Sequence, residues 1–253
     1  MLHDIIFFIV GLIVGVMNAV AGGGMLVGFP ALIALGIPPL VANASTGVII
    51  LPGQLASAYG YRKYLRKVPK QYLLLALPLA IGAAIGATAL RHTSPARFQN
   101  LAPVLIALAV ILFALQPLLH FHLHRHLKGK TKSNAPLWLL ACALLPMAAY
   151  GGFFGAGFGF IMLAFLGFTN LHDLHLMNGL KNMTAVVIAT TVVICLFSAH
   201  LIDWRHALIV AAGNLLGGYY GAVHAQKVST HAIRIVVIII GLTSAVYLGI
   251  HQY

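Results

Sequence analysis

Long apolar stretches recur from one end of this chain to the other. An α-helix needs about 20 apolar residues to cross the hydrocarbon core of a bilayer. Only 7% of the residues are charged, whereas roughly 25% are charged in a soluble domain. The pattern predicts an all-α, polytopic membrane protein. The apolar stretches fall near residues 5–20, 25–40, 44–60, 71–90, 98–119, 136–150, 155–169, 179–200, 206–225 and 232–250.

The few charged residues are unevenly placed. The chain has three acids, Asp4, Asp173 and Asp203, against fifteen Lys and Arg, and nine of those fifteen lie within 61–70 and 124–133. Short basic loops between apolar segments are typical of the cytoplasmic side of a membrane protein. This placement indicates the lipid bilayer as a partner and argues against nucleic acid as one.

The chain repeats itself at an offset of 135 residues without a gap. The basic loops 61–70 and 120–135 are two spans apart and share one side, whereas 196–205, the counterpart of 61–70, has lost its net charge. We therefore expect two inverted repeats of about five apolar segments each, with 8–10 transmembrane helices, some broken or re-entrant. Duplication without inversion is the alternative. The repeats would cover 1–119 and 136–253, joined by a basic, histidine-rich cytoplasmic linker over 120–135. Matching pairs include Asn43 with Asn178, Gly22 with Gly157, Gly24 with Gly159, Gly82 with Gly217, and Gly86 with Gly221.

Both repeats open with a glycine-rich irregularity, AVAGGGMLVGFP (19–30) and YGGFFGAGFGF (150–160). Glycine costs about 1 kcal/mol relative to alanine inside a helix, so three in a row should break one. Broken backbone at membrane depth is tolerated only where it is buried in protein or lines a cavity. The matched breaks therefore indicate a substrate site. Close helix packing is the competing interpretation, and it explains the spacing of Gly82 and Gly86 better.

A polar helix start follows each break, ANAST (42–46) and MNGLKN (177–182). Helical spacing puts Asn43 on one face with Thr46, and Asn178 on one face with Lys181. Asparagine is a favoured N-cap, and helix N-termini attract anions. Capping alone and snorkelling of Lys181 to the interface are the alternatives. The donors favour an anionic substrate, and the candidate binding residues are Asn43, Ser45, Thr46, Asn178, Lys181, Asn182, Gly22, Gly23, Gly24, Gly157 and Gly159.

The segments VAGGGMLVGFPALIALGIPPLVANAS, LPGQLASAYGYRKYLRK and GGFFGAGFGFIMLAFLG…HLMNGLKNM resemble the TauE/SafE family, and the resemblance covers nearly the entire chain. It implies a multi-pass transporter of the bacterial inner membrane for sulfite, sulfoacetate or a related organosulfonate. The family's asparagine motifs fall on Asn43 and on Asn178, Lys181 and Asn182. Its glycine motifs fall on Gly22–Gly24 and Gly155–Gly159. The family includes export and uptake, so it does not imply a direction.

We expect secondary transport by alternating access, with export as the favoured direction. A monoanion leaving a cell with a negative interior gains about 2.3 kcal/mol per 100 mV. All three acids lie at segment ends, so no carboxylate inside the membrane is placed to carry a coupling proton. Proton- or sodium-coupled uptake and an anion channel are the alternatives, because histidines such as His206 titrate near neutrality and backbone carbonyls at the breaks could bind sodium.

Other functional classes find little support in the sequence. It contains no H-E-x-x-H or G-x-S-x-G motif and no two acids close together, so we expect no enzymatic activity and no cofactor. In HFHLHRH (120–126) four histidines alternate, which would place them on one side of an extended strand. Metal binding there is conceivable, but a basic interfacial anchor is favoured, so we expect no metal. A homodimer is one alternative for the oligomeric state.

Overall fold

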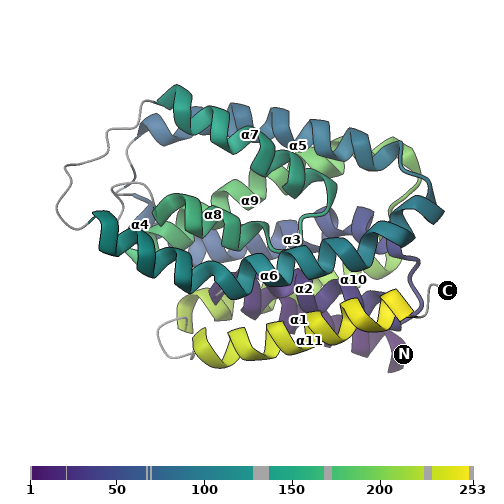
Figure 1. Cartoon of the computed structure of the whole chain (residues 1–253). Coiled ribbons are helices and arrows are strands. Elements are labelled where there is room, and N and C mark those ends of the chain that lie inside the picture. Colours follow the sequence, from purple (N-terminus) through teal and green to yellow (C-terminus); the bar gives the residue numbers. More distant parts are fainter. Residues whose placement is uncertain are drawn as a thin grey trace.

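A computed structural model of the chain describes residues 2–20, 22–66, 68, 70–127, 137–167, 173–224 and 230–250. All regular secondary structure in these ranges is helical, which confirms the all-α prediction. The long helices lie side by side and run along roughly one direction (Figure 1). The elements are α1 (Leu2–Val20), α2 (Gly24–Ala34), α3 (Pro39–Gly60), α4 (Arg62–Leu65), η1 (Lys70–Leu75), α5 (Ala76–Arg91), α6 (Pro95–Leu127), α7 (Leu137–Phe153), α8 (Phe158–Gly167), α9 (Leu174–Leu196), η2 (Phe197–Ala199), α10 (Trp204–His224) and α11 (Thr230–Ile250).

The outer surface of the bundle is apolar. Leu2, Leu73 and Ile194 are each at least 70% exposed, together with many other large apolar side chains. In water such a surface would be an aggregation liability, whereas lipid covers it. The protein is therefore a multi-pass membrane protein. Within the described ranges, five stretches are long and apolar enough to cross a membrane: Leu2–Val20, Pro39–Gly60, Leu73–Arg91, Pro95–Leu115 and His175–Ala199; shorter apolar helices are Gly24–Ala34, Trp138–Phe153 and Ile238–Ile250.

The chain breaks at both glycine-rich stretches, as the sequence predicts. α1 ends at Val20 and α2 begins at Gly24, while α7 ends at Phe153 and α8 begins at Phe158. Gly22, Gly155 and Gly157 have φ angles of 90°, 73° and 81°, a region that glycine enters without the steric penalty of a Cβ. At 1.5 Å per residue, the 11 residues of α2 and the 10 of α8 cover about half of a 30 Å hydrocarbon core.

The same helix contact occurs twice in the fold. At the 135-residue offset α1 corresponds to α7, and α10 corresponds to α5. In the first contact, a Cβ on Gly217 of α10 would collide with the backbone of Leu12 in α1. In the second, a Cβ on Gly86 of α5 would collide with the backbone of Ala149 in α7. The structure thus confirms close packing as the role of these spaced glycines.

The end of α6 differs from the prediction for the linker. The backbone of residues 120–127 is helical and continues α6 to Leu127, so the alternating histidines of HFHLHRH do not share one side as they would in an extended strand. A helix continues wherever its backbone hydrogen bonds can form, and no glycine or proline interrupts 118–127. Residues 128–135, the remainder of the expected linker, lie outside the described residues.

Candidate functional site

The two glycine-rich breaks contact each other. A Cβ added to Gly159 would lie 2.7 Å from the carbonyl oxygen of Gly22, and one added to Gly22 would lie 3.2 Å from the backbone of Gly159. Only glycine allows so close an approach without a shift of the backbone. The contact brings four helix ends near one another: the carboxyl ends of α1 and α7 and the amino ends of α2 and α8.

These helix ends give the site both positive and negative partial charges. The first four N–H groups and the last four carbonyls of a helix have no partner within it, and the ends carry about +0.5 and −0.5 charge. The carboxyl ends of α1 and α7 therefore attract positive groups, and the amino ends of α2 and α8 attract negative ones. One N–H of α2 is capped internally, since Gly24 N donates to Asn18 Oδ1 at 2.9 Å.

The place where the two breaks meet is called the crossing below. Lys181 of α9 is buried there, with 1% of its surface exposed. Its Nζ donates to the backbone carbonyl of Asn18 at 2.8 Å and to Asn178 Oδ1 at 3.1 Å. Its Cδ lies 3.3 Å from the Cβ position of Gly22. The ammonium does not snorkel to an interface; it sits against the negative end of α1.

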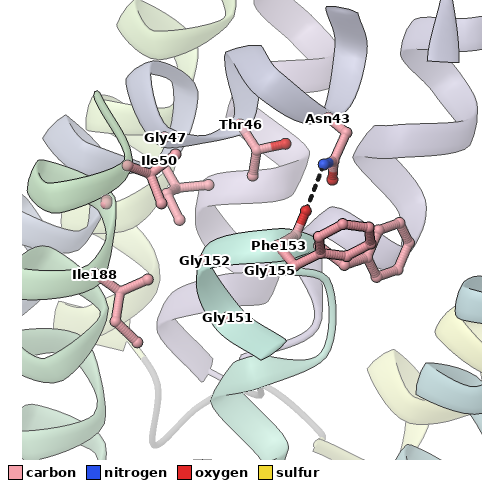
Figure 2. A pocket seen from close by; sticks show the side chains of 12 residues that line it. Asn43, Thr46, Gly47, Ile50, Gly151, Gly152, Phe153, Gly155 and Ile188 are labelled. Atoms are coloured by element: carbon pink, nitrogen blue, oxygen red, sulfur yellow. Dashed lines mark hydrogen bonds between the residues drawn. The ribbon is translucent and has the colours of Figure 1, made fainter. Parts of the chain in front are cut away.

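Asn43 of α3 makes the corresponding contact in the other half of the molecule. Its Nδ2 donates to the carbonyl oxygen of Phe153 at 2.7 Å, at the end of α7 (Figure 2). Phe153 is the counterpart of Asn18 at the 135-residue offset, and Asn43 is the counterpart of Asn178. In each half, a side chain from one repeat binds the last turn of the broken helix of the other repeat.

A small cavity lies beside the Asn43 contact. It is lined by residues of α3, of the end of α7 and of α9, and its volume is about 20 Å³. One water molecule needs about 10–15 Å³ by this measure, so the cavity has room for about one water or one small ion. In Figure 2 Asn43, Thr46, Gly47 and Ile50 of α3 face the end of α7, with Ile188 of α9 at the side. The other lining residues are Gly151, Gly152, Phe153, Phe154, Gly155, Ala189 and Val192.

The predicted helix starts are shifted by one turn. α3 begins at Pro39 after Pro38, and α9 begins at Leu174 after Asp173, whose carboxylate accepts from His175 N and Leu176 N. Asn43 and Asn178 therefore lie inside their helices, and the expectation that they cap them is wrong. Asp173 is the N-cap of α9, whereas Asn178 accepts a hydrogen bond from Lys181.

The remaining candidate residues divide between the crossing and other contacts. Thr46 lines the cavity and donates to Ala42 O at 3.2 Å. Asn182 is fully buried, and neither amide atom has a hydrogen-bond partner within the described structure. Ser45 instead accepts from the backbone N–H of Asp203 at 3.0 Å, ahead of α10. The Cβ positions of Gly23 and Gly157 face Phe160 and Ala109, so these glycines allow packing.

Three further buried amide side chains were not among the candidates. Asn18, Gln54 and Asn214 are each at most 5% exposed, and each has at least one side-chain polar atom without a described partner. Each stands alone in an apolar stretch, GVMNAVA, LPGQLAS and AAGNLLG. An isolated amide inside a membrane span is the signal that would have found them.

The ion pairs of the described residues lie at helix ends. His206 Nδ1 lies 2.7 Å from Asp203 Oδ2 at the start of α10, and Asp4 pairs with Arg205 at 3.5 Å. Among the described residues, no three His, Cys, Asp or Glu side chains come close enough to hold a metal ion. The polar chemistry of the crossing therefore consists of one ammonium, amides, hydroxyls and helix ends.

Comparison with known proteins gives the family. The family described as Sulfite exporter TauE/SafE matches residues 7–248. A probable membrane transporter protein of Haemophilus influenzae is 28% identical over 242 residues, which is 92% of this chain and 89% of that protein. Probable membrane transporter protein ORF9 of Sinorhizobium sp is 25% identical over 95% of this chain and 90% of its own. Probable membrane transporter protein YfcA of Escherichia coli is 24% identical over 86% and 78%.

No solved structure gives a significant match to this fold. The family match extends from the first turns of α1 almost to the end of α11 and includes both breaks, Asn43 and Lys181. This chain is a membrane transporter and belongs to the TauE/SafE family.

Proposed function

We propose that the protein carries a small sulfur oxyanion or organosulfonate, such as sulfite or sulfoacetate, across the bacterial inner membrane by alternating access. The observation that carries this proposal is the buried Lys181, whose stem contacts Gly22 at the point where the break before α2 meets the start of α8. An ionisable group at this depth is costly and is functional by default.

The charges at the crossing favour an anionic substrate. The amino ends of α2 and α8 offer backbone N–H groups and positive dipole ends, the arrangement that binds anionic groups at helix N-termini. Lys181 adds a full positive charge, and its described partners, the carbonyl of Asn18 and the amide oxygen of Asn178, are neutral. A sulfonate or sulfite between the two half-helices would neutralise this charge with three acceptor oxygens.

An inverted-repeat arrangement is part of the proposal. Corresponding helices run in opposite directions in Figure 1: α3 runs toward α4, for example, whereas its counterpart α9 starts at that end. The exchange of contacts between Asn43 and Phe153, and between Lys181 and Asn18, also fits a two-fold relation. Half-helices at the interface of inverted repeats commonly hold substrate in secondary transporters.

Substrate entry needs a conformational change. The two breaks are in contact, with the Cβ position of Gly22 lying 3.2 Å from the backbone of Gly159, so a sulfonate does not fit between the amino ends of α2 and α8 as they stand. We infer that the half-helices α2 and α8 separate to admit the anion and then close, so that the site opens to one side of the membrane at a time.

The direction of transport depends on what accompanies the anion. An anion carried alone is driven outward by about 2.3 kcal/mol per 100 mV, so export is the direction that we propose for uniport. Cation-coupled uptake is the second candidate. One observation favours it: the ion-sized cavity at the negative end of α7, which Asn43 lines with an amide oxygen lacking a described partner.

Counterflow in proteoliposomes tests the proposal. Vesicles loaded with unlabelled sulfite, sulfoacetate, taurine or sulfate should accumulate the labelled form of the preferred anion transiently, and an imposed potential should change the net flux. Saturation and accelerated exchange would support a carrier. Large currents without exchange would indicate an anion channel, and movement of none of the anions would refute the proposed substrate class.

A further inference from the structure

The crossing is chemically asymmetric although its backbone is repeated. In the second repeat, the ammonium of Lys181 is held by the carbonyl of Asn18 and by Asn178 Oδ1. The counterparts of these two acceptors in the first repeat are the carbonyl of Phe153 and Asn43 Oδ1. The counterpart of Lys181 is Thr46, which is too short to fill the same space.

The cavity occupies the place that the missing lysine leaves. Asn43, Thr46 and Phe153 all line it, and its volume is about 20 Å³. Asn43 is 4% exposed, and its Oδ1 has no partner in the described part of the chain. A buried amide oxygen without a partner is costly, so an occupant that supplies positive charge would stabilise the site.

The polar groups that line the cavity offer hydrogen-bond acceptors rather than donors. Thr46 gives its hydroxyl proton to Ala42 O, so its oxygen lone pairs remain for an ion. The end of α7 adds the negative end of a helix dipole. None of the described residues that line the cavity carries a carboxylate, and neutral oxygen ligands suit one charge rather than two. Small hard cations take oxygen ligands of this kind.

We propose that the cavity between α3, α7 and α9 binds one sodium ion, which replaces in the first repeat the ammonium that Lys181 supplies in the second. Asn43 Oδ1, Thr46 Oγ1 and the carbonyl of Phe153 are its ligands. When the Asn43 amide rotates, its hydrogen bond to the carbonyl of Phe153 breaks, and Asn43 Oδ1 and that carbonyl each contact the ion instead. This inference rests on the proposed transport of an anion, because it makes this ion the cation that accompanies the anion.

Sodium binding changes the energetics of transport. For a monoanion carried alone, a negative interior lowers the equilibrium ratio of inside to outside concentration by roughly fifty-fold per 100 mV. One sodium ion per monoanion makes the translocated pair neutral, so the potential no longer opposes entry, and the sodium gradient drives uptake. Without the ion, the direction reverts to the export proposed for uniport.

Equilibrium binding of radiolabelled Na⁺ to the purified protein in detergent, with no anion present, tests the site. Choline holds the ionic strength constant. We expect saturable binding of one ion per chain. Thr46→Val removes one ligand oxygen at nearly constant shape and should weaken binding about tenfold or more, since contacts to a charged group are strong.

Thr191→Val is the matched control. Thr191 of α9 also donates to the carbonyl four residues earlier, Val187 O at 2.9 Å, and does not line the cavity. This variant should bind Na⁺ like the parent protein. Absence of saturable binding, or equal affinity in the Thr46→Val and Thr191→Val variants, would overturn the proposal and leave water as the occupant.

A second variant tests the correspondence between the repeats. Lys181→Thr should open an equivalent cavity against Asn18 and Asn178 and raise the number of bound ions to two per chain; one ion would refute the correspondence. These readouts need no transported anion. Sodium binding without counterflow of any sulfur anion would refute only the proposed substrate, and counterflow without sodium binding would refute only the sodium site.

Discussion

Replacing Lys181 by methionine separates the transport role of the ammonium from a structural one. Methionine has a similar length and no charge, so it fills the space beside Gly22 and removes only the positive group. At an effective dielectric constant of about 20, a charge pair about 4 Å apart is worth about 4 kcal/mol. Because 1.4 kcal/mol is a factor of ten, the variant should bind a monoanion about a thousandfold more weakly.

The stability of the same variant should change little. The substitution leaves the Asn18 carbonyl and Asn178 Oδ1 without their donor, at about 1–3 kcal/mol each. It also removes the desolvation cost of a buried ammonium, which is several kcal/mol in the opposite direction. The two effects are of similar size, so thermal unfolding in detergent should stay near that of the parent protein.

The assay for Lys181→Met is counterflow of labelled sulfite in proteoliposomes, alongside a thermal unfolding scan. We expect loss of counterflow with retained folding. Counterflow at the parent rate would remove Lys181 from the substrate site. If the variant lost both its folding and its counterflow, the two opposing stability effects would not cancel, and the main role of the ammonium would be to cap α1.

Three further predictions follow from the same geometry. Gly159→Ala should abolish transport, because its Cβ would lie 2.7 Å from Gly22 O and overpacking would cost about 1–3 kcal/mol of folding stability. The control is Gly36→Ala, which is strained at φ 90° but has no contact within 4 Å; it should cost about 1–2 kcal/mol of stability and still transport. Equal counterflow of both variants would refute the contact between the two breaks. Asn43→Ala and Asn178→Ala should impair counterflow to a similar degree, whereas an effect of only one would contradict a two-fold site. Accessibility labelling of tags at the two ends of the chain should report the same compartment, since the start of α1 and the end of α11 lie at one end of the bundle (Figure 1); opposite compartments would refute the inverted arrangement.

Local sequence determined much of the fold. Apolar length predicted the helical membrane architecture, and closely spaced glycines predicted the breaks at Gly22–Gly24 and Gly155–Gly157, because these signals act within one or two turns. The spaced glycines of α5 and α10 likewise predicted close helix packing. The helix starts were misplaced because Asp173 and Pro38 lie only a few residues before the asparagines that were expected to cap the helices.

The polar contacts of the site could not be predicted in this way, because they join distant parts of the chain. Asn43 binds a carbonyl 110 residues away, and Lys181 binds one 163 residues away. The repeat offset identified the residues that correspond, but not that each would bind the helix of the other half. It also gave no indication that the short Thr46 would leave a cavity where Lys181 fills the equivalent space.

A structure determined with selenite, a heavier analogue of sulfite, is the most direct test of the site. Anomalous scattering from selenium would locate the anion without reference to the protein. The account predicts one selenium position between the amino ends of α2 and α8, with an oxygen of the anion in hydrogen-bond contact with Lys181 Nζ. A single selenium position elsewhere, with Lys181 still bound only to Asn18 and Asn178, would contradict it.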